Sequence, residues 1–184
     1  MDKDNFLAID YNNFAKSMDF WKHITTKKLL IFQTDSMLCG NSHFTLDEFE
    51  KFDFIGARTP WDFKLYGGNG GLSVRDTEKS TQCVLDYEDG KLENLRKYGE
   101  DGFFARCFKL GGHNGRLGVG KLPTDSDKDR FAIQNYFNRP AFGAHQTSVQ
   151  LPRKPERSIP SILSRIWRSQ VNIQFFKKSI PLCL

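Results

Sequence analysis

The chain has 184 residues, of which 39% are hydrophobic and 14% aromatic, and this composition fits a single domain with an apolar core. It excludes intrinsic disorder, and there is no apolar run of the roughly 18 residues that a membrane-spanning helix needs. Residues 1–5 lack a basic stretch followed by an apolar one, so we expect no signal peptide and, by default, a cytoplasmic location. A longer N-terminus could carry a membrane or secretory anchor.

The net charge of +5 is unevenly distributed along the chain. Residues 151–184 hold seven Lys or Arg and one Glu, a charge of +6, which leaves −1 for residues 1–150. The main body therefore lacks the basic surface that nucleic-acid binding requires, and we expect no nucleic-acid partner. The four cysteines show no CxxC spacing, which disfavours a zinc site and predicts reduced thiols.

The first elements are a helix and a buried strand. Asp10 is predicted to cap a helix with Phe14, Met18 and Trp21 on one face. The continuous apolar run 29–32 predicts a strand covered on both faces, as in parallel sheets. Asp35 follows this strand. It is either a turn or capping residue, or a carboxylate that holds a hard cation and, through it, a phosphate.

A glycine-rich segment separates the next predicted elements. Thr45 and Glu48 form a capping-box pattern, and 52–57 reads as a second strand. Residues 67–71 hold four glycines and lead into a strand at 72–75 and a helix at 77–87. Glycines allow a ligand to approach the backbone closely, although a plain turn before a strand explains them equally well.

The second half of the main body offers two further candidates. Glu100 and Asp101 lie together between glycines, and either is suited to act as a general base, or both are acids favoured at a helix N-terminus. His145 ends the last of two short predicted strands, at 131–134 and 142–145, and is either a structural histidine or a metal ligand.

The tail has a different character and sets the predicted division of the chain into 1–150 and 151–184. Residues 151–160 hold three prolines, which is typical of a linker. The segment from Ser161 has the apolar spacing of a basic amphipathic helix. We expect this helix to dock on its own domain, with a disordered tail and an anionic membrane surface as the less favoured alternatives.

Taken in chain order, five blocks carry a family resemblance. They are 29–39, 54–57 with Trp61, 68–75, 100–104 and 142–145. Together they resemble a glycosyltransferase-like domain family of uncharacterised function, similar to the A-type nucleotide-sugar glycosyltransferases. The resemblance covers about residues 10–148. It implies an α/β fold with a Rossmann-like, mostly parallel sheet flanked by helices.

The resemblance also implies a reaction and a site. The reaction is metal-dependent transfer of a sugar from a nucleotide-sugar donor to a hydroxyl-bearing acceptor. Asp35 and His145 would bind Mn²⁺ or Mg²⁺, and Asp101 or Glu100 would be the catalytic base. The residues implied in substrate binding are Asn69, Gly70, Gly71 and Trp61.

The sequence departs from the family pattern in two places. Gln33-Thr34-Asp35 stands where the family has an Asp-x-Asp motif, so only the last acid corresponds. Only 34 residues precede Asp35, which predicts that at least one N-terminal strand of the nucleotide-binding half is missing. Two alternatives therefore stay open: a non-catalytic carbohydrate or nucleotide-sugar binding remnant, and an interaction protein that docks through its basic C-terminal helix.

Overall fold

The computed structural model describes residues 7–40, 42–60, 66–134 and 140–146. Trp61 and the tail from residue 147 lie outside the described residues, and so do the predicted linker and amphipathic helix. The strands are β1 (Lys28–Phe32), β2 (Ser36–Leu38), β3 (Phe54–Ala57), β4 (Asn69–Asp76), β5 (Ala132–Ile133) and β6 (Gly143–His145). The α-helices are α1 (Ala8–Ala15), α2 (Met18–Trp21), α3 (Thr77–Glu88), α4 (Glu100–Leu110) and α5 (Asp125–Phe131).

The main sheet is antiparallel, so the prediction of a mostly parallel, Rossmann-like sheet is wrong. Its strand order is β1-β4-β3, and β4 pairs antiparallel with both neighbours. Val74 in the central strand lies opposite Leu30 on one side and Ile55 on the other. The α/β class holds only in the coarse sense that helices and strands pack together.

The apolar run that suggested a parallel sheet has another physical cause. Leu29 and Ile31 are buried toward the helices, while Leu30 and Phe32 pack against a second apolar cluster on the opposite face. Both faces of β1 are therefore covered, as predicted. Coverage explains an apolar sequence but carries no information on the direction of the neighbouring strands.

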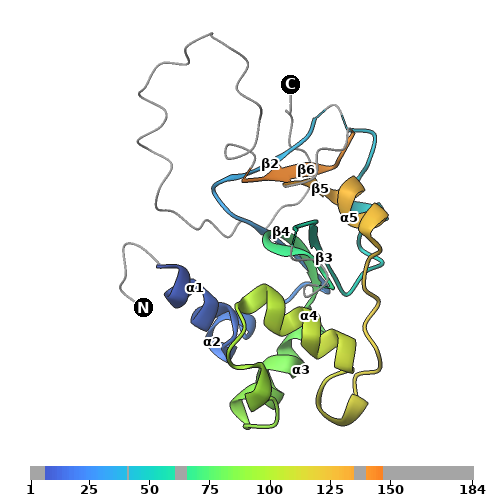
Figure 1. Ribbon diagram of the computed structural model, residues 1–184. Helices are drawn as coiled ribbons and strands as arrows, with labels where there is room; N and C mark the ends of the chain where they lie inside the picture. Colours follow the sequence, from blue (N-terminus) through green and yellow to red (C-terminus); the bar gives the residue numbers. More distant parts are fainter. Residues whose placement is uncertain (1–6, 41, 61–65, 135–139, 147–184) are drawn as a thin grey trace.

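A second, smaller sheet lies beyond one end of the first (Figure 1). Its order is β2-β6-β5, with β2 and β6 antiparallel and β5 and β6 parallel. Ser36 pairs with His145 in this sheet. The sheet therefore brings the segment that follows β1 next to the last described strand of the chain.

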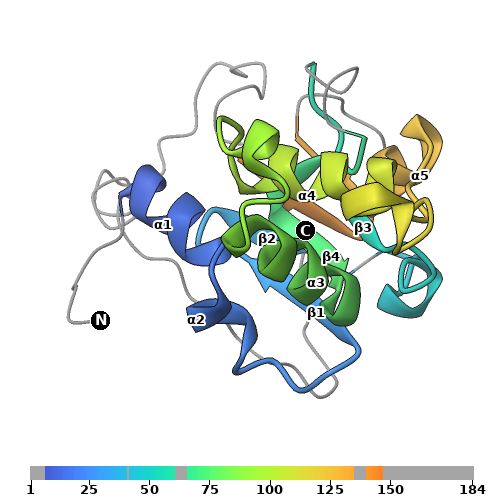
Figure 2. The same cartoon turned by 90° about the horizontal axis from the view of Figure 1, so that it is seen from below.

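Two apolar clusters hold the layers together. Helices α1 to α4 cover one face of the main sheet (Figure 2), and the cluster between them includes Trp21, Phe54 and Phe104. The other cluster joins the main sheet to α5 and includes Phe49 and Phe131, whose ring centroids are 5.1 Å apart. The many phenylalanines of the sequence therefore fill the core on both sides of β4.

Local signals predicted several elements well. The helix expected at 77–87 is α3, with the Asp76 carboxylate accepting from the Lys79 amide at its start. Glu48 accepts from the Thr45 amide at 3.0 Å, which confirms the capping interaction. The first helix is instead two: α1 ends at Ala15 and α2 starts at Met18, with Asp10 inside the first turn of α1.

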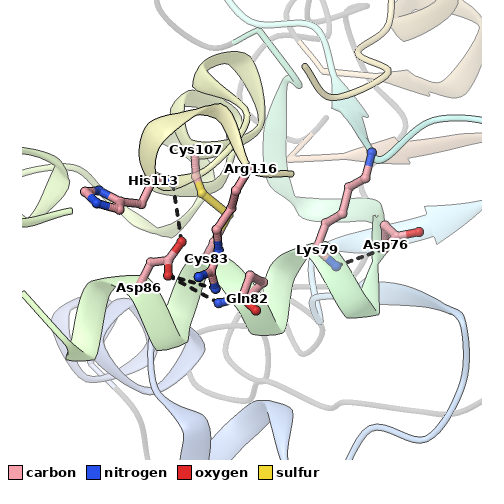
Figure 3. The surroundings of a disulfide bond; sticks show 8 residues. All are labelled: Asp76, Lys79, Gln82, Cys83, Asp86, Cys107, His113 and Arg116. Atoms are coloured by element: carbon pink, nitrogen blue, oxygen red, sulfur yellow. Dashed lines mark hydrogen bonds and ion pairs between the residues drawn. A yellow bond between two sulfur atoms is a disulfide. The ribbon is translucent and has the colours of Figure 1, made fainter. Parts of the chain in front are cut away.

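A disulfide between Cys83 and Cys107 joins α3 to α4 (Figure 3). For these two cysteines, the prediction of reduced thiols is therefore wrong. Both side chains are fully buried, and their Cα atoms are 6.2 Å apart across the helix pair. Spacing along the chain could not reveal this pair, because disulfide partners are set by how the helices pack.

Within the segments that the structure describes, no helix combines the length and the apolar character needed to cross a membrane.

Candidate functional site

The glycine segment forms an irregularity at the start of β4. The pairing register with β3 shifts between Gly56 and Ala57, so that Ala57 lies opposite Asn69 while Gly56 lies opposite Ser73. The Asn69 side-chain oxygen accepts from the Gly71 amide at 2.8 Å, which holds the extra residues in a turn-like bulge. We call residues 69–71 the glycine bulge.

Gly70 and Gly71 pack against different polar groups. A Cβ atom at Gly70 would overlap the Glu100 carboxylate and meet the Arg75 guanidinium. A Cβ atom at Gly71 would overlap the His145 ring and the Gln33 amide. The lack of side chains here is therefore a packing requirement, and the bulge lies between two polar clusters.

The first cluster consists of Asp35, His145 and Gln33. His145 Nε2 lies 3.3 Å from Asp35 Oδ1 and 3.3 Å from Gln33 Oε1. His145 is 1% exposed, whereas the Asp35 side chain is 37% exposed. The hydrogen bond from His145 holds the pKa of the Asp35 carboxyl below its ordinary value, although partial burial opposes this.

Backbone pairing fixes this cluster in place. The backbone N–H of Gln33 donates to the Gly71 carbonyl at 2.8 Å, and the Ser36 hydroxyl donates to the same carbonyl at 3.2 Å. The Gln146 amide donates to the Asp35 carbonyl at 3.1 Å. Residues from the end of β1, the bulge and the end of β6 thus meet at one point.

The cluster supplies donor atoms that suit a hard divalent cation. A carboxylate oxygen, an imidazole nitrogen and an amide oxygen meet there, and the buried Nδ1 of His145 has no hydrogen-bond partner. Asp35 is exposed enough to share a cation with a ligand from solvent. Over the described ranges, however, no group of three His, Cys, Asp or Glu residues is close enough to hold a metal.

The second cluster is the buried ion pair of Arg75 and Glu100. Arg75 is 0% exposed, and its guanidinium lies 4.7 Å from the ring centroid of Phe54 and 5.0 Å from that of Phe104. Burial raises the pKa of Glu100 to about 7, while the positive charge of Arg75 acts in the opposite direction.

The two predicted base candidates have different surroundings. Glu100 is nine-tenths or more buried and paired with Arg75, so it cannot approach a hydroxyl from solvent. Asp101 is half-buried in the first turn of α4, where its Oδ1 accepts from the Gly102 amide at 2.6 Å. Of the two, Asp101 has the accessible carboxylate.

Sequence reasoning missed Arg75, Gln33 and Tyr11. Arg75 carried a detectable signal, because a charged residue in a buried strand has to be paired. Tyr11 on α1 is buried near Glu100, and burial raises the pKa of its phenol. Its hydroxyl lies near Gln33 without a hydrogen bond of good geometry. No local pattern marks Tyr11 or Gln33 as members of a site.

The structure thus brings Asp35 and His145 into contact, with Gly71 against His145 and Gly70 against Glu100. Residues 2–147 match the model of a family described as protein of unknown function DUF5672, and the chain belongs to this family. No curated protein and no solved structure matches the chain. The family description assigns no activity.

Proposed function

We propose that this chain is a glycosyltransferase-like domain that transfers a sugar from a nucleotide-sugar donor to a hydroxyl-bearing acceptor with the help of Mn²⁺ or Mg²⁺. The observation that carries the proposal is the contact between Asp35 and His145 beside Gly71. These residues come from distant parts of the sequence, and the family resemblance implies the same metal-binding role for both acid and histidine.

Asp35 and His145 would hold the cation, with the Gln33 amide oxygen as a third donor atom. When bound, such a cation neutralises charge that develops on the leaving diphosphate. The chain's own contribution is to fix the donor atoms. The hydrogen bond between His145 Nε2 and Asp35 keeps the two side chains together, and Nε2 would give up that proton to act as a ligand. The β2–β6 pairing and the Gln146 amide hold the backbones of His145 and Asp35.

The glycine bulge supports the substrate-binding half of the proposal. Gly70 and Gly71 are buried and pack directly against the polar clusters, which brings the half-buried Asn69 close to both clusters. The Asn69 oxygen is engaged by the Gly71 amide, which leaves the Asn69 NH₂ group as a donor for a sugar hydroxyl.

Asp101 is the better candidate for the base that removes the acceptor's proton. It is ionisable and half-buried, whereas Glu100 is committed to Arg75 and is partly protonated near neutral pH. General bases act within hydrogen-bond reach of the proton that they remove, so accessibility decides between the two.

A second candidate function is nucleotide-sugar binding without turnover. The observation that favours it is the small donor set, since no trio of His, Cys, Asp or Glu suited to a metal occurs among the residues with described positions. Turnover separates the two functions, because both predict binding of the nucleotide and only the enzyme releases a nucleoside diphosphate.

Thermal unfolding with Mn²⁺ and a panel of nucleoside diphosphates tests the proposal. A ligand at about 100 times its Kd stabilises the native state by about 2.7 kcal/mol, so the melting temperature rises. Asp35→Ala is expected to abolish the rise, and Asp47→Ala, an exposed acid on the 3₁₀ turn Leu46–Glu48, is expected to retain it. No rise with any nucleotide in the unchanged protein would reject the donor site.

Release of nucleoside diphosphate from a panel of nucleotide sugars then tests for transfer. We expect Asp101→Asn to lower kcat by about 10²-fold or more while the Mn²⁺-dependent thermal shift persists, because the base acts after the donor is bound. Nucleotide binding without turnover in the unchanged protein would favour the binding module instead.

A further inference from the structure

Arg75 occupies an unusual position for a charged residue. It is fully buried in the core, with its guanidinium close to the rings of Phe54 and Phe104, and its ion-pair partner Glu100 is buried as well. Removing two charges from water costs several kcal/mol per ion, and an apolar pair of the same volume is often equally stable or more so. Stability alone therefore gives a weak reason for this pair.

The pair connects the two parts of the candidate site that lie on the helix side of β4. Arg75 Nε donates to the Ser73 hydroxyl at 3.3 Å, and that hydroxyl donates to the Gly70 carbonyl at 2.9 Å. Arg75 Nη2 also contacts Glu100 Oε2. One guanidinium is therefore linked to the glycine bulge and to the first residue of α4.

The first turn of α4 is held by apolar packing as well as by polar contacts, because Phe103 is fully buried and its ring centroid lies 5.2 Å from that of Tyr87. The Glu100 amide donates to the Asn12 side-chain oxygen at 2.7 Å, and the Phe103 amide donates to the Gly99 carbonyl at 2.8 Å. Asp101 lies in this turn and is followed by Gly102, which does not stiffen the backbone. Asp101 directly follows Glu100 in the chain, and its Oδ1 accepts from the Gly102 amide at 2.6 Å.

We propose that Arg75 is a positioning residue, which holds Glu100 beneath Gly70 and thereby fixes the orientation of Asp101 relative to the glycine bulge. This inference rests on the proposed function for the role of Asp101. The planar guanidinium suits the task, because its donors point in fixed directions and can reach Glu100 and Ser73 together, whereas a lysine ammonium is a single point charge.

Native-state hydrogen exchange tests the inference without any substrate. In the double variant R75M/E100M, which leaves no buried charge unpaired, we expect the Phe103 amide to exchange at least about 10-fold faster, since its turn loses the ionic contact that ties it to β4. Amides in the interior of α3 are expected to keep their rates. R96M/E93M, which removes the exposed pair of Arg96 and Glu93 at 2.7 Å, is the matched control and is expected to change neither.

R75K gives a second and milder test, because it keeps the positive charge and serves even if the double variant does not fold. We expect faster exchange at Phe103 in this variant also, and rates close to the unchanged protein in E100Q, which keeps an acceptor for Arg75. An unchanged Phe103 rate in R75K, or equal acceleration at Phe103 and throughout α3, would show that Arg75 has only a structural role.

Turnover kinetics distinguish a positioning role of Arg75 from a purely structural one. With any nucleotide sugar that the unchanged protein consumes, we expect R75K to lower kcat by about 10²-fold while the donor KM stays within about twofold. Equal losses in kcat and donor binding would overturn the inference. If the unchanged protein consumes no donor, the proposed function fails, and the exchange rates still decide whether Arg75 orders the start of α4.

Discussion

The His145 ring lies 3.3 Å from the Asp35 carboxylate, although Asp35 follows β1 and His145 ends β6, the last strand that the structure describes. The antiparallel pairing of β2 and β6 produces this contact, because Ser36 lies opposite His145. The same pairing places the His145 ring against Gly71, so that a single register determines the geometry of the cluster. A slip by one residue would turn His145 to the other face of its sheet.

Gly71→Ala should displace the His145 ring, because the new Cβ atom would overlap its Nε2. We expect a loss of stability of about 1–3 kcal/mol from overpacking and a loss of the Mn²⁺-dependent thermal shift. Gly70→Ala is the matched variant, since its Cβ would meet Glu100 and Arg75 instead. Urea unfolding should report both losses, but imidazole NMR signals of His145 should move strongly only in Gly71→Ala.

Glu100 should make stability depend on pH. Its pKa rises from 4.5 to about 7 on folding because of burial, so the folded state binds the proton more tightly than the unfolded state. The stabilising contribution of Glu100 is complete below pH 4.5, its pKa in the unfolded chain, and is lost as the pH rises through about 7, its pKa in the folded protein. The loss is on the order of 3 kcal/mol at most.

Urea unfolding of the unchanged protein and of E100Q between about pH 5 and about pH 8 measures this effect. As the pH rises, the unfolding free energy of the unchanged protein should fall relative to that of E100Q. A difference that stays constant over this range would contradict the raised pKa.

The disulfide between Cys83 and Cys107 should contribute substantially to stability. Its partners are 24 residues apart, and closing a loop of that size in the unfolded chain corresponds to about 3.5 kcal/mol in the chain-entropy model. We expect C83A/C107A to lose stability of this order, and Cys39→Ala, which leaves the Cys83–Cys107 bond intact, to lose much less.

Peptide mapping under non-reducing conditions checks the bond directly. Disulfides persist mainly in oxidising compartments, so a Cys83–Cys107 peptide from the native source would argue against the default cytoplasmic location. Free thiols at both positions in that source would favour it.

Asp86 should be a stabilising residue of α3. Its side chain is fully buried, accepts from the His113 amide at 3.3 Å and pairs with Arg116 at 3.2 Å (Figure 3). Asp86→Ala leaves these donors without their acceptor, and we expect a loss of about 2 kcal/mol by urea unfolding. Asp89→Ala, which removes an exposed partner of Lys91, should cost less than about 0.5 kcal/mol. Equal effects would contradict this assignment.

Some of the elements could be predicted from the sequence, whereas α5 and β2 were missed. The helix of α3, the capping interaction of Glu48 and the strands β3 and β4 followed from local periodicity and turn chemistry. The break between α1 and α2 did not, because the apolar spacing continues from Phe14 to Trp21 while the backbone turns between the helices. Tertiary packing decided that boundary.

Strand direction could not be predicted, since an apolar strand in the middle of either sheet type looks the same. Candidate site residues could be named from motif order, but their contacts could not be derived. Arg75 and Gln33 show the limit most clearly, because each matters through a partner that is distant in the chain. The disulfide was missed for the same reason.

The amino-acid sequence by itself determined the position of α3, the approximate positions of β1, β3, β4 and β6, which residues are apolar enough to form the core, and which carboxylates and histidine are candidate site residues. Only the tertiary structure decided that the main sheet is antiparallel, that Asp35 meets His145, and that Glu100 is buried against Arg75. The physical reason is that propensity and capping act over a few residues. Pairing register and buried ion pairs instead depend on which distant segments exclude water together.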